Sequence, residues 1–236
     1  MSGGRAGLAG RLARGVFGFL GGLVLAGILW VALYAVVPVV WTPLMTLRAL
    51  EGAPPAQVRW VPLDRISPAL VHAVIGAEDS RFCAHDGIDW PAVRAAWTER
   101  QEGGRLRGGS TISMQVAKNA FLWPERSWLR KVLEAWFTLW VELFWPKSRV
   151  MEVYLNIAEW GDGIYGAEAA ARAHFGKAAA DLSRREAALL AAVLPSPRRW
   201  SVTDPGPYVR RRLAILEDRA AIVRRDGLAA CVAGPG

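Results

Sequence analysis

The longest run of apolar residues lies near the amino terminus and spans residues 16–41 without a charged side chain. This length is sufficient for a helix to cross the hydrocarbon core of a bilayer with some tilt. Aromatic side chains, which favour the membrane interface, stand toward its far end at Trp30, Tyr34 and Trp41. The pattern therefore predicts one transmembrane helix over residues 16–41.

Basic residues precede this run at Arg5, Arg11 and Arg14, and the first acidic residue is Glu51. Because positive charge is retained on the cytoplasmic side, residues 1–15 are expected in the cytoplasm and the bulk of the chain on the other side. A cleaved signal peptide is the alternative, but its apolar core is usually about 7–15 residues long and ends at small residues. The present run is longer, so an uncleaved anchor is favoured.

Prolines separate the apolar run from the rest of the chain, at Pro43, Pro54, Pro55 and Pro62. Such spacing is typical of an extended connection with room for one short strand. We expect three further parts: a linker over residues 42–57, a folded domain over 58–225 and a tail over 226–236.

Helix start and stop signals follow one another through the folded part. Residues suited to an N-cap or a first turn stand at Ser67-Pro68, Asp89, Ser110 or Thr111, Ser127, Ser183 with Glu186, and Pro207. The predicted helices end near residues 100, 121, 144 and 225, and two more span about 148–156 and 166–175. Few stretches alternate with period two, so the domain is predicted to be all-α, mainly helical, with no sheet of any size.

The segment 121–145 is unusually aromatic: Phe121, Trp123, Trp128, Trp136, Phe137, Trp140, Phe144 and Trp145. A second membrane span is disfavoured because Arg130, Lys131, Glu134 and Glu142 interrupt it. Core packing and an amphipathic element resting in the lipid interface both explain the pattern.

The charge of the chain favours an anionic partner. The net charge is +8, and residues 49–236 carry 25 basic and 21 acidic side chains, a net charge of +4. A mild excess of this kind suits phosphate or an anionic lipid surface. Nucleic acid is not expected as a partner, because no Lys/Arg-rich patch with interleaved aromatic residues is present.

Two cysteines, Cys83 and Cys231, have neither the spacing of a metal site nor that of a disulfide framework. They could pair only if the fold brought the tail to the first motif. We expect two unpaired thiols.

Adjacent carboxylates stand at the end of a predicted helix, Glu78 and Asp79. A neighbouring like charge or partial burial raises the pKa of a carboxyl group and yields a usable general base or acid. An acidic pair by itself is usually a solvated helix terminus. Here Phe82, His85 and Gly87 indicate a packed turn that holds Glu78, with His85 as a structural hydrogen-bonding residue.

A glycine-led turn, Gly108-Gly109-Ser110-Thr111, opens the next helix but one. Backbone N–H groups and hydroxyls at a helix start form an anion site. Gln115 and Lys118 follow on the same helix face. Most such turns are ordinary caps, and the Gly-x-x-x-x-Gly-Lys-Ser/Thr pattern of a phosphate-binding loop is absent.

A basic group with a carboxylate follows, at Arg126, Arg130, Lys131 and Glu134. The last three share a helix face, because they are spaced three to four residues apart. Two interpretations remain: a surface salt bridge, or a cationic cradle for pyrophosphate beside a second carboxylate.

Together these motifs resemble the peptidoglycan glycosyltransferase (transglycosylase) family of class A penicillin-binding proteins and of stand-alone monofunctional enzymes. The resemblance covers roughly residues 58–225, and no transpeptidase domain follows, so the chain is similar to the monofunctional type. It continues through Lys147-Ser-Arg-Val-Met-Glu-Val-Tyr-Leu-Asn156, Ala158–Gly163, Ala171–Lys177, Leu182–Ala191 and Pro195-Ser-Pro197.

The resemblance implies a lysozyme-like helical fold with a small membrane-facing lobe, which overlaps the aromatic segment 121–145. Glu78 matches the family's essential base and Glu134 its second essential carboxylate. Donor contacts are implied for Ser110, Thr111, Gln115, Lys118, Arg126, Arg130 and Lys131. Supports of the cleft are implied at Asp79, Phe82, His85, Gly109, Glu152 and Asn156. The family tends to have glutamine where this chain has Met114, which puts a hydrogen bond at that position in doubt.

The implied reaction lengthens a glycan strand on a lipid pyrophosphate by transfer to the 4-hydroxyl of lipid II, with inversion to a β-1,4 bond. No cofactor is obligatory, although a divalent cation, Mg²⁺ or Mn²⁺, could accompany the pyrophosphate near Glu134. The implied partners are lipid II, the growing strand and the bilayer, with cell-division or elongation proteins as further candidates. The implied location is the inner membrane, with the catalytic domain in the periplasm.

Two other classes fit parts of the sequence. A membrane-bound muramidase would use Glu78 as an acid and would need no phosphate cradle, and it would shorten glycan chains where a transferase lengthens them. A non-catalytic scaffold of the division or elongation machinery would tolerate loss of Glu78 and Glu134. The basic group beside both carboxylates argues against the scaffold.

Overall fold

The computed structural model describes residues 3–103, 109–125 and 127–233. It divides into two compact units, Met1–Val37 and Pro38–Gly236. The first unit consists of one helix and the second contains the folded domain, and each is described by itself.

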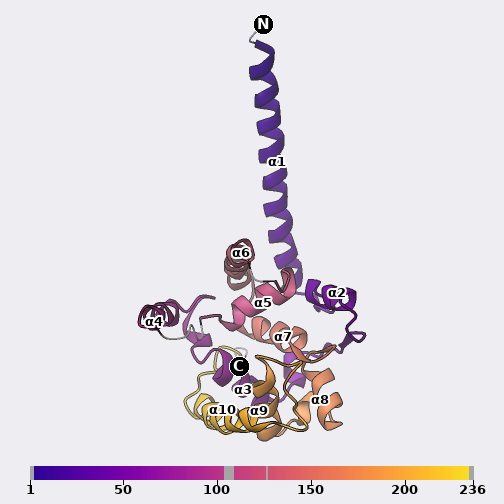
Figure 1. Ribbon diagram of the computed structural model, residues 1–236, viewed down its shortest axis with the longest axis vertical. Helices are drawn as coiled ribbons and strands as arrows, with labels where there is room; N and C mark the ends of the chain where they lie inside the picture. Colours follow the sequence, from indigo (N-terminus) through magenta and orange to yellow (C-terminus); the bar gives the residue numbers. More distant parts are fainter. Residues whose placement is uncertain (1–2, 104–108, 126, 234–236) are drawn as a thin grey trace. The chain divides into compact units, whose positions relative to one another are not determined.

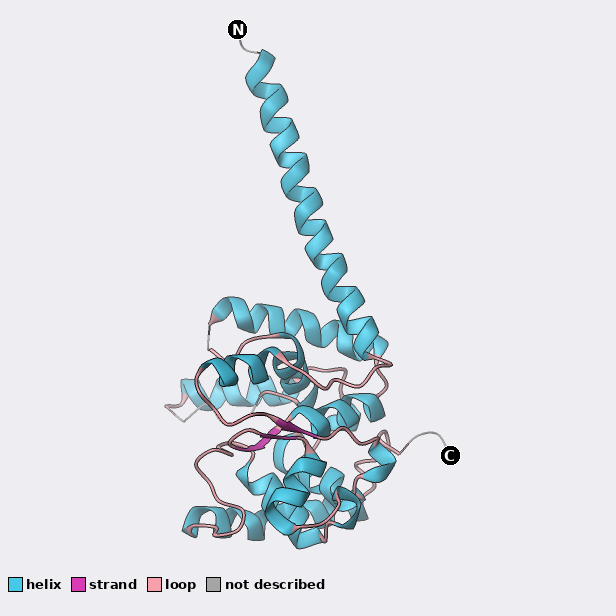
Figure 2. Cartoon of the chain, turned by 90° about the vertical axis from the view of Figure 1, so that its right-hand side faces the viewer, coloured by secondary structure: helices cyan, strands magenta, loops and turns pink. Residues whose placement is uncertain are grey.

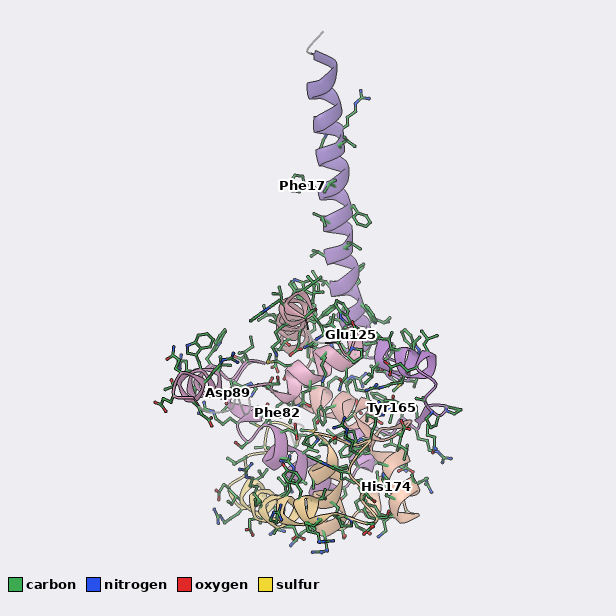
Figure 3. The ribbon with its side chains drawn as sticks, in the orientation of Figure 1. Phe17, Phe82, Asp89, Glu125, Tyr165 and His174 are labelled. Atoms are coloured by element: carbon green, nitrogen blue, oxygen red, sulfur yellow. A yellow bond between two sulfur atoms is a disulfide. The ribbon has the colours of Figure 1, made fainter. Side chains whose placement is uncertain are left out.

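The first unit is helix α1, Gly3–Tyr34. Its segment Gly10–Tyr34 is long and apolar enough to cross a membrane. Its side chains are largely exposed, as Phe17 illustrates (Figure 3). The helix starts before the predicted span 16–41 and stops at Tyr34, so residues 35–41 of that span are not helical. Pro38 explains the early stop, because proline cannot donate a helical hydrogen bond and disfavours helical backbone in the residue before it.

The predicted linker 42–57 contains a helix that the sequence pattern did not predict. Helix α2, Pro43–Leu50, starts with Thr42 as its N-cap, whose side chain accepts a hydrogen bond from the N–H of Met45 at 3.3 Å. Proline is compatible with the first turn of a helix, so Thr42-Pro43 is a start signal here and not a helix breaker. After α2 the chain continues through strand β1, Gln57–Val58, and the 3₁₀ helix η1, Leu63–Arg65.

One group of helices packs around α3, Pro68–Glu78. Helices α9, Arg184–Val193, and α10, Pro207–Arg225, lie against it (Figure 1). The contact with α10 is close at Gly76, where an added Cβ would lie 3.1 Å from the Cβ of Arg219 and 3.2 Å from the backbone N of Ala220. Position 76 therefore favours glycine, because a side chain there would press against α10.

A second group is centred on α5, Ile112–Phe121, which contacts both α6, Trp128–Phe144, and α7, Lys147–Ile157 (Figure 1). The rings of Phe121 and Phe137 stack with their centroids 4.7 Å apart. Helices α4, Trp90–Gln101, and α8, Ala167–Phe175, complete the domain with the 3₁₀ helices η2, Phe82–Ala84, and η3, Ala179–Asp181.

Most predicted helix starts are confirmed. Side chains of Asp89, Thr111 and Ser127 accept hydrogen bonds from the first turns of α4, α5 and α6, and Ser183 with Glu186 forms the predicted capping box of α9. Ser67 does precede α3, but its hydroxyl donates to the carbonyl of Leu182 and not to the helix end. The mainly helical fold class is confirmed as well.

A small sheet lies between the two helix groups (Figure 2). Strand β3, Ile164–Tyr165, pairs in parallel with β1 and antiparallel with β2, Glu159–Gly161. The turn after β3 requires glycine, because Gly166 has a φ of +86° and a Cβ would lie 2.6 Å from the carbonyl oxygen of Asn156. Strands of two or three residues leave almost no period-two pattern, which is why the sequence does not show them.

The aromatic segment 121–145 divides between the two interpretations. Phe121, Phe137 and Trp145 are buried, so part of it is core. Another set on α6 is exposed: Trp128, Leu129, Val132, Leu139 and Leu143. Exposed apolar side chains on one helix are typical of a surface that meets an apolar environment.

The expectation of two unpaired thiols is wrong. Cys83 in η2 and Cys231 beyond α10 form a disulfide, with their Cα atoms 5.5 Å apart across 148 positions of sequence. The fold brings Cys231, in the predicted tail, to the first motif, which was the condition for pairing. Pairing that depends on such a distant approach cannot be read from residue spacing.

The long loop closed by this disulfide predicts a measurable contribution to stability. Reduction of the full chain, or the double substitution Cys83→Ser/Cys231→Ser, should lower the free energy of unfolding by about 2–5 kcal/mol, because the cross-link removes chain entropy from the unfolded state. Urea unfolding with and without a reducing agent measures the effect. The double variant is the control, since its midpoint should not respond to reductant. An unchanged wild-type midpoint on reduction contradicts the prediction.

Candidate functional site

Glu78 is the last residue of α3, and its side chain is 16% exposed. Gln115 of α5 donates its amide Nε2 to Glu78 Oε2 at 3.0 Å. On the other side, Arg212 Nη2 lies 3.5 Å from Glu78 Oε1. Donors from two different helices therefore meet the two carboxylate oxygens, while part of the group stays open to solvent.

Arg212 and Tyr154 belong to this site, although no sequence motif had selected them. Arg212 lies in α10, 134 positions from Glu78. The Tyr154 hydroxyl, in α7, lies 3.4 Å from Gln115 Oε1. Burial raises the pKa of the Tyr154 phenol well above its ordinary value, and the charge of Glu78 adds to the shift. Tyr154 lies within the motif Lys147–Asn156, but the sequence analysis selected only Glu152 and Asn156 from that motif as site residues.

Glu134 is enclosed by two cations of its own helix. Its side chain is 3% exposed, Lys131 Nζ lies 2.6 Å from Oε1, and Arg130 donates to Oε2. The predicted shared face is confirmed. Arg130 is also buried, so its pair with Glu134 is not a surface salt bridge. Lys131 is 41% exposed, and its Nζ lies 3.5 Å from the hydroxyl of Ser110.

Lys118 links the two carboxylates. Burial lowers the pKa of its ammonium group, the charges of Arg130 and Lys131 lower it further, and the charges of Glu134 and Glu78 oppose the shift. Lys118 therefore lies in the electrostatic field of both acids. It also lines a cavity of about 180 Å³ together with Gln115 and Tyr154. Gln115, which donates to Glu78, thus shares this cavity with Lys118 of the same helix.

Ser110 and Thr111, in the turn before α5, were both predicted to contact the donor, but they differ in exposure. Ser110 is exposed, whereas Thr111 is buried. The Thr111 hydroxyl accepts the N–H of Met114 at 3.1 Å and donates to the carbonyl of Gly87, so its hydrogen-bonding capacity is used inside the protein. Gly109 has a φ of +120°, a conformation that favours glycine. Arg126 and Gly108 lie outside the described residues.

Met114 packs in the core, with 5% of its surface exposed. A thioether offers only a weak acceptor, so this position supplies no strong hydrogen bond to a ligand. The polar face of α5 consequently begins one residue later, at Gln115.

The residues predicted to support the first motif make buried contacts. Asp79 Oδ1 lies 3.0 Å from His85 Nε2, and Asp79 Oδ2 accepts the N–H of Ile112 at 3.1 Å. Phe82 is fully buried beside them (Figure 3). These contacts attach the end of α3 to the start of α5.

Glu152 and Asn156 act on a different segment, the chain before α3. Glu152 accepts the N–H of Leu63 at 3.0 Å, and Asn156 accepts the N–H of Val61 at 2.9 Å while donating to its carbonyl at 2.8 Å. They hold the extended entry to α3 against α7. Their contacts with the remainder of the site are indirect.

Glu134 is already paired with cations of the protein itself. Both of its oxygens already accept hydrogen bonds from cations, Arg130 and Lys131. Among the described residues no group of three or more His, Cys, Asp or Glu side chains could hold a metal ion. The cationic side chains beside Glu134, Arg130 and Lys131, are of the type that attracts an anionic ligand.

Comparison with known proteins points in one direction. The sequence model of a family described as Transglycosylase matches residues 46–221. A biosynthetic peptidoglycan transglycosylase of Rhodospirillum centenum is 62% identical over 225 residues, which cover 95% of this chain and 97% of the relative. Proteins of the same name from Caulobacter vibrioides and Jannaschia sp. are 53% and 51% identical, over 89% and 94% of this chain and 92% and 89% of the relatives.

The opposing charges around Lys118 predict shifts of opposite sign. Glu134→Gln should lower the pKa of the Lys118 ammonium further, because the carboxylate that opposes the shift is lost. Lys131→Gln should raise it, because a repelling cation is lost. NMR titration of ¹⁵N-labelled lysine ammonium groups measures both. The Lys177 ammonium, which pairs with Glu186 at 2.9 Å, serves as the control. If neither substitution moves the Lys118 titration, Lys118 and Glu134 do not share a cleft.

Proposed function

The chain belongs to the transglycosylase family, and on that premise we propose that it polymerises peptidoglycan glycan strands from lipid II. The donor is a glycan strand on a lipid pyrophosphate, and the acceptor is the 4-hydroxyl of lipid II. One observation carries the proposal: Gln115 of α5 donates to Glu78, and Ser110, just before the same helix, lies 3.5 Å from Lys131, which pairs with Glu134. These contacts support a base beside an anion site.

Glu78 serves as the general base in this proposal. It takes the proton of the acceptor hydroxyl as the oxygen attacks the anomeric carbon of the donor, and the α-linked phosphate is replaced by a β-1,4 bond. A base must be held within hydrogen-bond reach of the proton that it removes. The contacts from Gln115 at 3.0 Å and Arg212 at 3.5 Å support this role, because they fix the carboxylate while leaving it partly open.

The cations of the cleft serve the leaving group. Lys131 and Lys118 offset the charge that develops on the departing pyrophosphate, which is the larger electrostatic task of the reaction. Arg130 is buried against Glu134, and this supports a role in which Glu134 orients the two cations. The predicted contacts from Ser110 and Arg126 extend the same anion site. No step is assigned to a metal ion.

The location follows from two features. Helix α1 serves as the membrane anchor, and the arginines near the start of the chain, Arg5, Arg11 and Arg14, support a cytoplasmic amino terminus. The folded domain then faces the periplasm from the inner membrane. The disulfide supports this assignment, because disulfides persist in oxidising compartments and are rare in the cytoplasm.

The bilayer also contacts the folded domain in this proposal. The exposed apolar face of α6, which begins with Trp128 at 89% exposure, is the surface that rests in the lipid interface. Both substrates carry lipid chains, so a lipid-facing helix that also carries Glu134 keeps the anion site close to the headgroups.

Loss of the base should stop polymerisation without unfolding the protein. Glu78→Gln should lower the rate of chain lengthening on labelled lipid II by about 10²–10⁴-fold, because general-base assistance is removed. Glu102→Gln, a change of an exposed acid in the same chain, is the control. Gel analysis of the products also separates a transferase, which lengthens chains, from a muramidase, which shortens them. Near-normal lengthening by a folded Glu78→Gln protein contradicts the assignment.

The proposed lipid contact of α6 predicts site-specific cross-linking. A photoreactive amino acid at Val132, which is 64% exposed, should cross-link to phospholipid when the full chain is reconstituted in vesicles. Ile215, which is 53% exposed, is the matched apolar control, because its helix α10 lies at the other end of the folded domain from α6 (Figure 1). Equal labelling of lipid from both positions, or none from Val132, excludes the proposed contact.

A further inference from the structure

A buried ion pair outside the proposed catalytic set closes a ring of polar contacts. Lys147, the first residue of α7, places its Nζ 2.8 Å from Glu142 Oε1. The two side chains are 14% and 9% exposed. Neither touches Glu78 or Glu134, and nothing in the proposed reaction uses them.

The ring connects this pair to the first motif. Lys147 Nζ also donates to the backbone carbonyl of His85 at 2.7 Å. His85 Nε2 in turn bonds to Asp79 Oδ1 at 3.0 Å, and Asp79 Oδ2 accepts the N–H of Ile112 at 3.1 Å. The hydroxyl of Ser113, the next residue, donates to Glu142 and completes the circuit.

Each element in the ring carries a residue of the proposed site. Asp79 follows Glu78 at the end of α3, Ser113 lies two residues before Gln115 in α5, and Glu142 lies two turns after Glu134 in α6. The relative placement of the base, its hydrogen-bond donor and the second carboxylate is therefore determined by contacts that meet at Glu142.

The backbone beside the ring leaves no space for adjustment. Gly87 has a φ of +85°, and an added Cβ would lie 2.7 Å from Thr138 Cγ2 and 2.8 Å from Glu142 Cγ. The Phe82 ring lies under Lys147, with Nζ 4.6 Å from the ring centroid. Close packing on both sides means that a shift of Glu142 or Lys147 is transmitted to the first motif.

We propose that Glu142 and Lys147 are positioning residues for the glycosyl transfer. Their ion pair holds the ends of α3, α5 and α6 in register, so that Glu78 and Glu134 face the same bound donor. The inference rests on the proposed function. If Glu142 and Lys147 only position other residues, their loss should lower kcat and leave KM unchanged, because neither side chain is proposed to contact the substrate.

The test removes both charges together, since loss of one partner leaves the other charge buried and unpaired. In the full chain, Glu142→Gln/Lys147→Met should keep the melting temperature close to that of the wild type. Its kcat on lipid II should fall on the order of a hundredfold, the scale expected when remote changes misplace reacting groups by about 1 Å, with KM unchanged. Lys147→Arg preserves the pair and should retain most of the turnover.

The matched control is Lys177→Met/Glu186→Gln, which removes another Lys–Glu pair, 2.9 Å apart and outside the ring, while Gln keeps the capping box. Its kcat should equal that of the wild type. A folded ring variant with wild-type kcat overturns the proposal, as does a fall in kcat of the same size in the control. If the double variant does not fold, Glu142→Gln alone tests the proposal through the same split between kcat and KM.

Failure of the proposed function would look different, because the wild type and the control would then not lengthen lipid II either. In that case hydrogen exchange decides the positioning claim. The amides of the segment Ile112–Gln115 should exchange faster in the ring variant than in the control, and equal protection overturns the claim.

Discussion

A buried carboxylate is stable only where cations and hydrogen-bond donors replace the water that it has lost, and this constraint organises the folded domain. Asp79 is met by His85 and the N–H of Ile112. Glu134 is met by Arg130 and Lys131. The donors to Asp79 come from the turn after α3 and from α5, so satisfying this acid attaches α3 to α5, whereas the donors to Glu134 come from its own helix and fix the side chains on one face of α6.

The same constraint gives the two acids of the proposed site, Glu78 and Glu134, different surroundings. Glu134 has both oxygens occupied by cations and is almost fully enclosed, so it suits the orientation of charge. Glu78 receives one contact at 3.0 Å and a longer one at 3.5 Å and keeps part of its surface open. An open carboxylate can reach a substrate proton, and an enclosed one cannot. The two glutamates of the proposed site thereby have different surroundings, which suit the different tasks proposed for them.

Sequence patterns predict the parts of the structure that depend on neighbours along the chain. The predicted caps at Asp89, Thr111 and Ser127 are correct, because a cap involves only three or four consecutive residues. The grouping of Arg130 and Lys131 with Glu134 is equally local. Helix α2 escapes prediction because the prolines around it resemble helix breakers, and the predicted span 16–41 runs too far because apolar character continues past Pro38 while the helix does not.

The sequence by itself determined the apolar anchor segment, the helical character of the domain and the candidate acids, because these follow from periodicity, capping and residue type over short distances. Only the tertiary structure decided that Arg212 and Tyr154 belong to the site, that Cys83 pairs with Cys231, and that Thr111 faces inward. These contacts join residues 24 to 148 positions apart, and the free energy that selects them comes from burial, which no local pattern encodes.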